Sequence, residues 1–131
     1  MSRRDRAPRR GAAAVELALS LPIVLMLAGA VFDYGMFMRS LAFANNAVRE
    51  GARAGARMEV SDTPGPEEVA LTSVARVLDD AGVASGAYDV SAAITGDDGI
   101  AVSVDIPFTP LVGLVPTPAS ARAVIVMRLQ D

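Results

Sequence analysis

Residues 12–32 read AAAVELALSLPIVLMLAGAVF, and this stretch decides the architecture of the chain. It contains twenty-one residues with a single ionisable group, Glu16. As an α-helix it would be about 31 Å long at about 1.5 Å per residue, close to the hydrocarbon thickness of a bilayer. Pro22 is compatible with this interpretation because membrane helices tolerate proline at a kink. The stretch therefore predicts a transmembrane helix.

Basic residues gather directly ahead of this helix. Residues 1–11 contain five arginines and one acid, whereas the rest of the chain contains seven arginines and fourteen acids. Lys and Arg are retained on the cytoplasmic side, which predicts a cytoplasmic N-terminus and a C-terminal domain on the other side of the membrane. We interpret the arginines as this topology signal and not as a nucleic-acid-binding arm. They are Arg3, Arg4, Arg6, Arg9 and Arg10.

The composition limits the chemistry open to the chain. Among its 131 residues there is no cysteine and no histidine. This excludes a disulfide framework and a thiolate metal site, and it removes the commonest general base. The acidic doublets, Asp79-Asp80 and Asp97-Asp98, stand at a predicted helix end and in a predicted turn, where Asp serves local hydrogen bonding. We expect no enzymatic activity, no bound metal and no cofactor.

The apolar helix allows three interpretations. Ala28-Gly29-Ala30 fits a signal-peptidase site, and cleavage near Ala30 would release a small α+β binding protein outside the cytoplasm. However, the apolar run continues through Val31 and Phe32 and is longer than an ordinary signal sequence. The helix could also be an uncleaved anchor of a single-pass accessory protein. The third interpretation, an anchor that is processed ahead of the apolar run, depends on Glu16.

Glu16 is an unusual residue for a membrane helix. A carboxylate at the centre of a bilayer costs a few kcal/mol, and Glu16 stands only about one turn inside the predicted end, where the cost is smaller. Its side chain could reach the cytoplasmic headgroups and have no further role. Intramembrane acids usually have a partner, however, and this favours a functional role.

The residues around Glu16 resemble a known family. The run RGAAAVE at residues 10–16, followed by Leu21-Pro22, is similar to the N-terminus of a type IV prepilin, in which Gly follows basic residues and an acid stands fifth after the cleavage point. More narrowly, residues 9–57 resemble the TadE-like family of minor pilin-like proteins of the tight-adherence (Flp-type) pilus, including the Asp33-Tyr34-Gly35 step. Leu17 is a departure from this pattern, since major Flp pilins have Tyr at this position and many TadE-like proteins have Phe. The absence of Tyr argues against a major pilin and leaves the minor, TadE-like resemblance standing.

The resemblance implies a mechanism of processing and assembly. A prepilin peptidase would cut between Gly11 and Ala12 and remove the leader arginines. Glu16 would then pair with the N-terminal ammonium of a neighbouring subunit. Opposite charges attract strongly in a low-dielectric helix bundle, and each relieves the desolvation of the other. The implied partners are the lipid bilayer, the peptidase and other pilin-like subunits, in the bacterial inner membrane or an extracellular pilus.

Beyond the membrane the helical pattern continues to about residue 57. Apolar residues recur at spacings of four, three, four and four, which is one helical stripe. Arg49, Arg53 and Arg57 form a second stripe, which we interpret as a solvated face, and Gly51 and Gly55 share a spacing that permits close helix packing. The apolar stripe consists of Phe37, Leu41, Ala44, Val48 and Ala52.

The remaining residues predict a small α+β domain. The breaker at residues 61–66 precedes a second helix over 67–81, with Gly82 as its stop. Alternating residues over 88–94, 100–108 and 121–129 predict three strands, and residues 96–99 predict a hairpin turn. We expect an α+β fold with a long N-terminal transmembrane and stalk helix, a short helix and a three-stranded antiparallel sheet packed on helix 67–81. The expected parts are a leader (1–11), a transmembrane helix (12–32), its extracytoplasmic continuation (33–60) and the domain (61–131).

Overall fold

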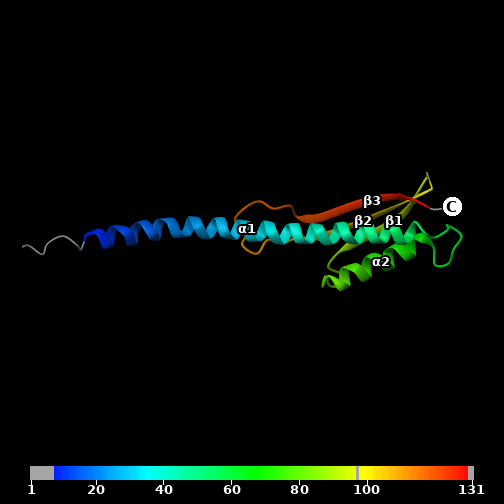
Figure 1. Cartoon of the computed structure of the whole chain (residues 1–131), viewed down its shortest axis with the longest axis horizontal. Coiled ribbons are helices and arrows are strands. Elements are labelled where there is room, and N and C mark those ends of the chain that lie inside the picture. Colours follow the sequence, from blue (N-terminus) through cyan, green and yellow to red (C-terminus); the bar gives the residue numbers. More distant parts are fainter. Residues whose placement is uncertain (1–7, 97, 130–131) are drawn as a thin grey trace, which may run out of the picture.

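The computed structural model describes residues 8–96 and 98–129. Its elements follow the expected order and type, so the predicted fold class is confirmed. They are α1 (Pro8–Gly55), α2 (Pro66–Asp80), β1 (Asp89–Thr95), β2 (Gly99–Pro107) and β3 (Ser120–Arg128). One long helix projects from a small domain whose other elements pack against its C-terminal half (Figure 1).

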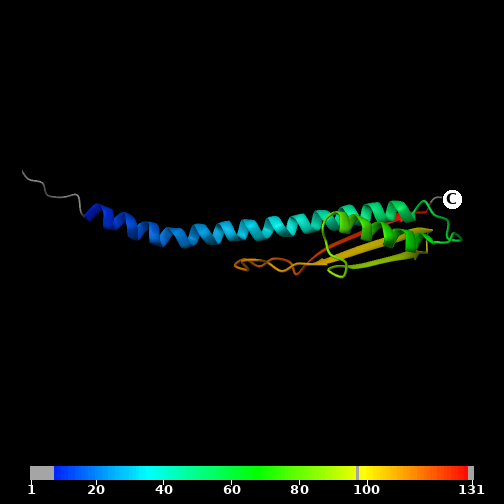
Figure 2. The ribbon, with the colours of Figure 1, turned by 90° about the horizontal axis from the view of Figure 1, so that it is seen from below.

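Helix α1 contains 48 residues and is about 72 Å long at about 1.5 Å per residue. It begins at Pro8, which is ahead of the predicted start and suits the first turn because a helix leaves that N–H unpaired anyway. The segment Gly11–Gly55 is long and apolar enough to cross a membrane, with a most apolar window of mean hydropathy 2.2, none of it buried. The N-terminal half of α1 therefore stands free of the domain (Figure 2).

The C-terminal half of α1 is part of the domain core. The predicted stripe is confirmed, because Phe37, Ala44, Val48 and Ala52 are buried and Leu41 packs against them. Ala47 and Ala56 extend the buried surface. Most of these side chains are small, which lets neighbouring elements approach the helix axis closely.

The three strands form an antiparallel sheet in the order β1-β2-β3. Val102 of β2 is in register with Ala92 of β1 and Ile125 of β3, and all three side chains belong to the core or pack against it. The alternation over 121–129 places Ala123, Ile125, Met127 and Leu129 on one face, and these side chains belong to the core or pack against it. Val124 and Val126 are exposed on the outer face of β3. The sheet thus has one covered face and one open face.

The cover of the sheet differs from the prediction. The sequence placed helix 67–81 against it, but α1 packs on β2 and β3 while α2 lies mainly against α1 and β1. The core residues of α1 are all hydrophobic, whereas the buried residues of α2 include Ser73. The stalk helix is therefore also the central core helix of the domain.

Two glycines fix the helix ends. Gly82 has a φ of +79°, and its N–H and that of Val83 bond to the carbonyls of Asp79 and Leu78, which terminates α2 as predicted. At Gly55, where α1 ends, a Cβ would lie 2.7 Å from the Pro66 carbonyl oxygen and 2.6 Å from Ile100 Cδ1. Only glycine permits this contact between α1, α2 and β2, so the predicted close helix packing is confirmed there.

Candidate functional site

The predicted processing and assembly residues lie on the free half of α1. Gly11, Ala12 and Glu16 are helical and exposed. The peptide bond between Gly11 and Ala12 lies in the first turns of the helix, so a protease would have to unwind those turns to bind it in an extended form. Glu16 is exposed and stands between exposed apolar residues, including Val15 and Leu17.

The predicted topology signal is described only in part. Arg9 and Arg10 belong to the first turn of α1, whereas Arg3, Arg4 and Arg6 lie outside the described residues. Asp97, from the second acidic doublet, also lies outside them. Within the described residues there is no cluster of acids placed to hold a metal ion.

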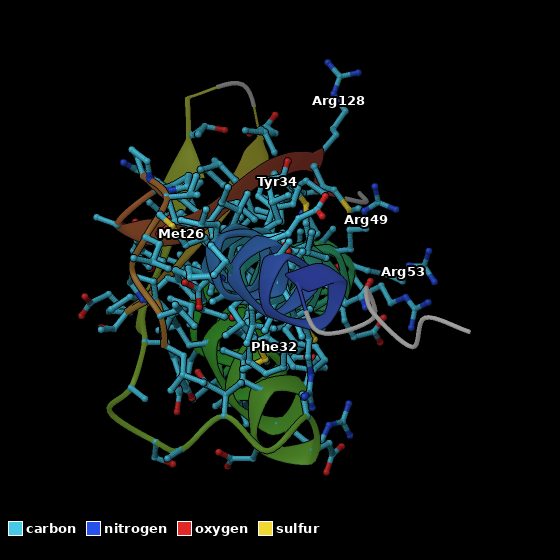
Figure 3. The ribbon with its side chains drawn as sticks, turned by 90° about the vertical axis from the view of Figure 1, so that its left-hand side faces the viewer. Met26, Phe32, Tyr34, Arg49, Arg53 and Arg128 are labelled. Carbon is cyan, nitrogen blue, oxygen red and sulfur yellow. The ribbon has the colours of Figure 1, made fainter. Side chains whose placement is uncertain are left out.

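The arginine stripe on the C-terminal half is exposed. In a view along α1 from its N-terminal end, Arg49 and Arg53 point outward on the same side, and Arg128 of β3 points away from the molecule nearby (Figure 3). Arg53, Arg57 and Arg128 line one shallow groove. The sequence pattern found the stripe, but the addition of Arg128 depends on the pairing of β3 with β2.

Asp33 is a site that the sequence did not single out beyond its place in the resemblance. Its side chain is 1% exposed and accepts hydrogen bonds from three consecutive backbone N–H groups of the β2–β3 loop, residues 108–119. Leu111 N lies 2.9 Å from Oδ1, Gly113 N lies 2.8 Å from Oδ2, and Val112 N lies 3.1 and 3.2 Å from the two oxygens. Gly113 has a φ of +67°, which turns its N–H toward the same carboxylate.

These hydrogen bonds determine the charge state of Asp33. Burial by itself raises the pKa of the Asp33 carboxyl, but the N–H groups of Gly113, Val112 and Leu111 stabilise the anion and leave the pKa below its ordinary value. Asp33 is therefore ionised at neutral pH and holds the loop as a charged acceptor. Hydrogen bonds to charged groups are stronger than those between neutral groups.

Two further contacts fix the same loop on α1. The ring of Phe108 meets that of Phe37 edge-on, with centroids 5.6 Å apart. Val112 packs on Gly29, where a Cβ would lie 2.9 Å from Val112 Cγ1. Gly29, Asp33 and Phe37 are four residues apart and so share one face of α1. The loop consequently runs back along the helix from the sheet toward the free half (Figure 2).

A four-residue spacing could have revealed this face. Gly29 and Asp33 continue the stripe that begins at Phe37, although Gly29 also fits a cleavage motif and Asp33 also belongs to the family's Asp-Tyr-Gly step. A charged residue in line with an apolar stripe is a signal for a buried, hydrogen-bonded acid. Its partner, however, is about eighty residues away in sequence, and no local pattern identifies it.

Comparison with known proteins bears on the whole helix. A family model described as TadE-like protein matches residues 11–53. This segment is similar to the TadE-like family. The predicted resemblance is thus confirmed over these residues, which are about a third of the chain and include Gly11, Glu16 and Asp33. No curated protein and no solved structure matches the chain.

The TadE-like segment coincides with α1 almost to its end. It contains both acids of interest, and they differ in surroundings: Glu16 is exposed on the free half, and Asp33 is buried under the loop. The matched residues end at 53, so α2, the sheet and the loop lie outside the segment. The matched segment therefore contributes the free apolar half of α1 and the core helix, and the rest of the chain folds onto its C-terminal half.

Proposed function

We propose that this protein is a minor pilin-like structural subunit of a tight-adherence pilus apparatus. The observation that carries the proposal is the match of the TadE-like family to residues 11–53, which form a helix whose N-terminal half is apolar and exposed. A helix that is apolar on all sides needs lipid or other apolar helices around it. A pilin-like anchor is surrounded by lipid in the membrane and by the apolar helices of neighbouring subunits in the assembled pilus, so its apolar surface is covered in both states.

In this proposal the chain is inserted with residues 1–11 in the cytoplasm and the domain on the opposite side. A prepilin peptidase cuts after Gly11, and the new ammonium of Ala12 and the carboxylate of Glu16 become the charged groups of the assembly surface. Glu16 is about four residues, or one helical turn, from that ammonium. A neighbouring subunit displaced by about one turn along the helix axis would bring the two charges together.

The contacts that hold the β2–β3 loop on α1, here called the clamp, favour a site of processing before Gly29. Val112 packs on Gly29, and Leu111, Val112 and Gly113 bond to Asp33. Cleavage after Ala30 would remove the first contact and leave Asp33 in the first turn of a new N-terminus, where the helix frays. Cleavage after Gly11 leaves the whole clamp in place.

The N-terminal residue of the mature protein tests this proposal. Intact-mass measurement of protein purified from membranes should give a chain beginning at Ala12. A chain beginning at Val31 would show a secreted domain released by signal peptidase, and one beginning at Met1 or Ser2 would show an uncleaved anchor. Either of those results would overturn the proposed processing.

Replacing the acid tests the proposed assembly role. We expect Glu16→Gln to insert into the membrane and fold normally but to reduce pilus assembly, because the amide cannot neutralise a buried ammonium. Glu50→Gln is the matched control, since Glu50 is an exposed acid on the same helix. Normal piliation of the Glu16 variant would refute the pairing role.

A further inference from the structure

We propose that the tip of the β2–β3 loop, residues 111–115, inserts into the membrane interface beside α1, on the side of the bilayer where the domain lies. The loop would be a second membrane-binding element, made of lipid-facing aliphatic side chains. This inference rests on the membrane anchoring in the proposed function and does not need the processing or pairing steps.

The exposed side chains of the loop tip are apolar. Leu111 is 79% exposed, and Val112, Leu114 and Val115 are each exposed by more than two-fifths. No charged residue occurs from residue 106 to residue 121. Contiguous exposed apolar side chains that are not interrupted by charges mark a surface that binds lipid or another apolar partner.

The position of the loop selects lipid as that partner. Val112 packs on Gly29, which lies three residues inside the apolar stretch that ends at Phe32, or about 4.5 Å at about 1.5 Å per residue. Interfacial elements bury their apolar face about 5–10 Å into the boundary between headgroups and acyl chains. A helix that spans the bilayer through residues 12–32 therefore brings the tip of the clamped loop to that depth.

The aromatic side chains on α1 mark the same level. Phe32 and Tyr34 are each about half exposed and flank Asp33 in sequence. Aromatic residues are enriched where a membrane helix leaves the hydrocarbon layer. Looking along the helix, Phe32 and Tyr34 point to different sides of α1 (Figure 3). Together with the loop they would surround the helix at the interface.

The backbone of the loop is suited to a poorly hydrated place. Pro110 has no N–H, and the N–H groups of Leu111, Val112 and Gly113 bond to Asp33. The N–H of Phe108 bonds to the carbonyl of Ala119 across the base of the loop. Backbone at membrane depth is tolerated only when its polar groups are satisfied within the protein. The Asp33 carboxylate fulfils this condition for the N–H groups of the first three tip residues, 111–113.

The chain offers a clean experiment because it contains no tryptophan. Leu111→Trp and Leu114→Trp place a fluorescent probe at the loop tip, on exposed side chains whose replacement leaves the core intact. Leu25→Trp, on the free half of α1, reports insertion of the helix itself. Val126→Trp, exposed on the outer face of β3, is the matched control away from the membrane.

Each full-length variant is reconstituted into phosphatidylcholine–phosphatidylglycerol vesicles with acyl chains brominated either near the headgroup or near the bilayer centre. We expect the loop probes to emit at shorter wavelength than the control and to lose fluorescence to the shallow bromines more than to the deep ones. The helix probe should be quenched in vesicles brominated at the matching depth. The Val126 probe should keep the emission and intensity it has in unbrominated vesicles.

The other outcomes separate the possible errors. If the helix probe is quenched and the loop probes are not, the loop inference is wrong and the anchor stands. If the helix probe is not quenched either, the anchoring part of the proposed function also fails. If the loop probes emit at short wavelength without quenching, and this shift disappears when protein is diluted in lipid, a second copy of the chain covers the loop and the lipid proposal is overturned.

Discussion

The two halves of α1 are both apolar, yet they occupy opposite environments. Residues 12–32 expose large aliphatic side chains on every side, whereas residues 37–56 bury one face of small side chains against α2 and the sheet. The two halves differ in how the apolar side chains are distributed around the helix and in how large these side chains are. A helix that is apolar all round has no preferred face for a single small domain. A stripe rich in alanine and glycine does, because other elements can approach it closely.

The acids of the two halves repeat this contrast. Glu16 is exposed on the free half, while Asp33 is buried with four hydrogen bonds from the β2–β3 loop. A single chain supplies the hydrogen-bond donors for the Asp33 carboxylate. Among the described residues, no such donor contacts the Glu16 carboxylate. The domain half of α1 therefore finds its packing and hydrogen-bond partners within one chain, whereas the free half depends on its surroundings.

The largest effect is expected from a charge in the buried stripe. Val48→Asp places a carboxylate at a position with no exposed surface, and an unpaired buried charge costs about 3–5 kcal/mol. For a small domain of marginal stability this unfolds a large fraction of the molecules. Arg49→Asp introduces the same side chain at the adjacent exposed position and should change stability by less than about 0.5 kcal/mol. Urea unfolding in detergent micelles, followed by protease resistance of the domain, measures both, and equal stabilities would contradict the assignment of the core face.

Smaller changes in stability are expected when a methyl group is added to a glycine of α1, and their sign should differ between Gly55 and Gly35. Gly55→Ala should destabilise the domain by about 1–3 kcal/mol, because the new Cβ meets the Pro66 carbonyl and Ile100. Gly35→Ala meets nothing within 4 Å and should leave stability unchanged or raise it by up to about 1 kcal/mol through helix propensity. Urea midpoints of the two variants test the pair. A stabilising Gly55 variant would show that the contact between α1 and α2 is looser than described.

The clamp should make stability depend on pH in the acid range. The pKa of Asp33 is lower in the folded protein than its ordinary value, so its contribution is fully present above the ordinary value of about 3.9. It is lost as the pH falls through the folded-state pKa. Asp33→Asn should unfold more easily at neutral pH and show a weaker loss of stability on acidification than the unchanged protein. Asp80→Asn, an exposed acid at the end of α2, should keep the original pH profile. Thermal unfolding between neutral and acid pH measures this.

The smallest effect on folding is expected on the free half. Glu16→Gln should change the stability of the domain by less than about 0.5 kcal/mol, because Glu16 precedes Phe37, the first core residue of α1, by several helical turns. Urea unfolding under the conditions used for the Val48 variant gives this value. A substantial loss of domain stability would mean that the two halves of α1 are energetically coupled, which would contradict the independence of the domain from the free half.

Much of the fold follows from local patterns. The four-residue and three-residue spacings from Phe37 to Ala52 predicted the core face of α1, and alternation on β2 and β3 predicted which side chains face inward. Gly82 predicted the end of α2, because a positive φ there is a local requirement. Helix and strand ends were predicted to within a few residues: the helical pattern was expected to continue to about residue 57, and α1 ends at Gly55.

The candidate site was predictable only where its chemistry is local. Gly11, Ala12 and Glu16 lie within one short run, and the resemblance in that run is supported by the family match. The clamp joins Asp33 to Leu111, Val112 and Gly113, and nothing near either partner in the sequence indicates the other. Such a pair depends on the path of the chain through α2 and two strands.

The sequence by itself determined that the chain has a free apolar helix, a short helix and three strands, because side-chain periodicity and breaker residues act over a few neighbours. Only the tertiary structure decided that the helix with the free apolar half is also the core helix of the domain, and that the β2–β3 loop returns along it to Gly29. Those outcomes follow from competition among all apolar surfaces for burial, and from the need of a buried carboxylate for donors wherever the chain provides them.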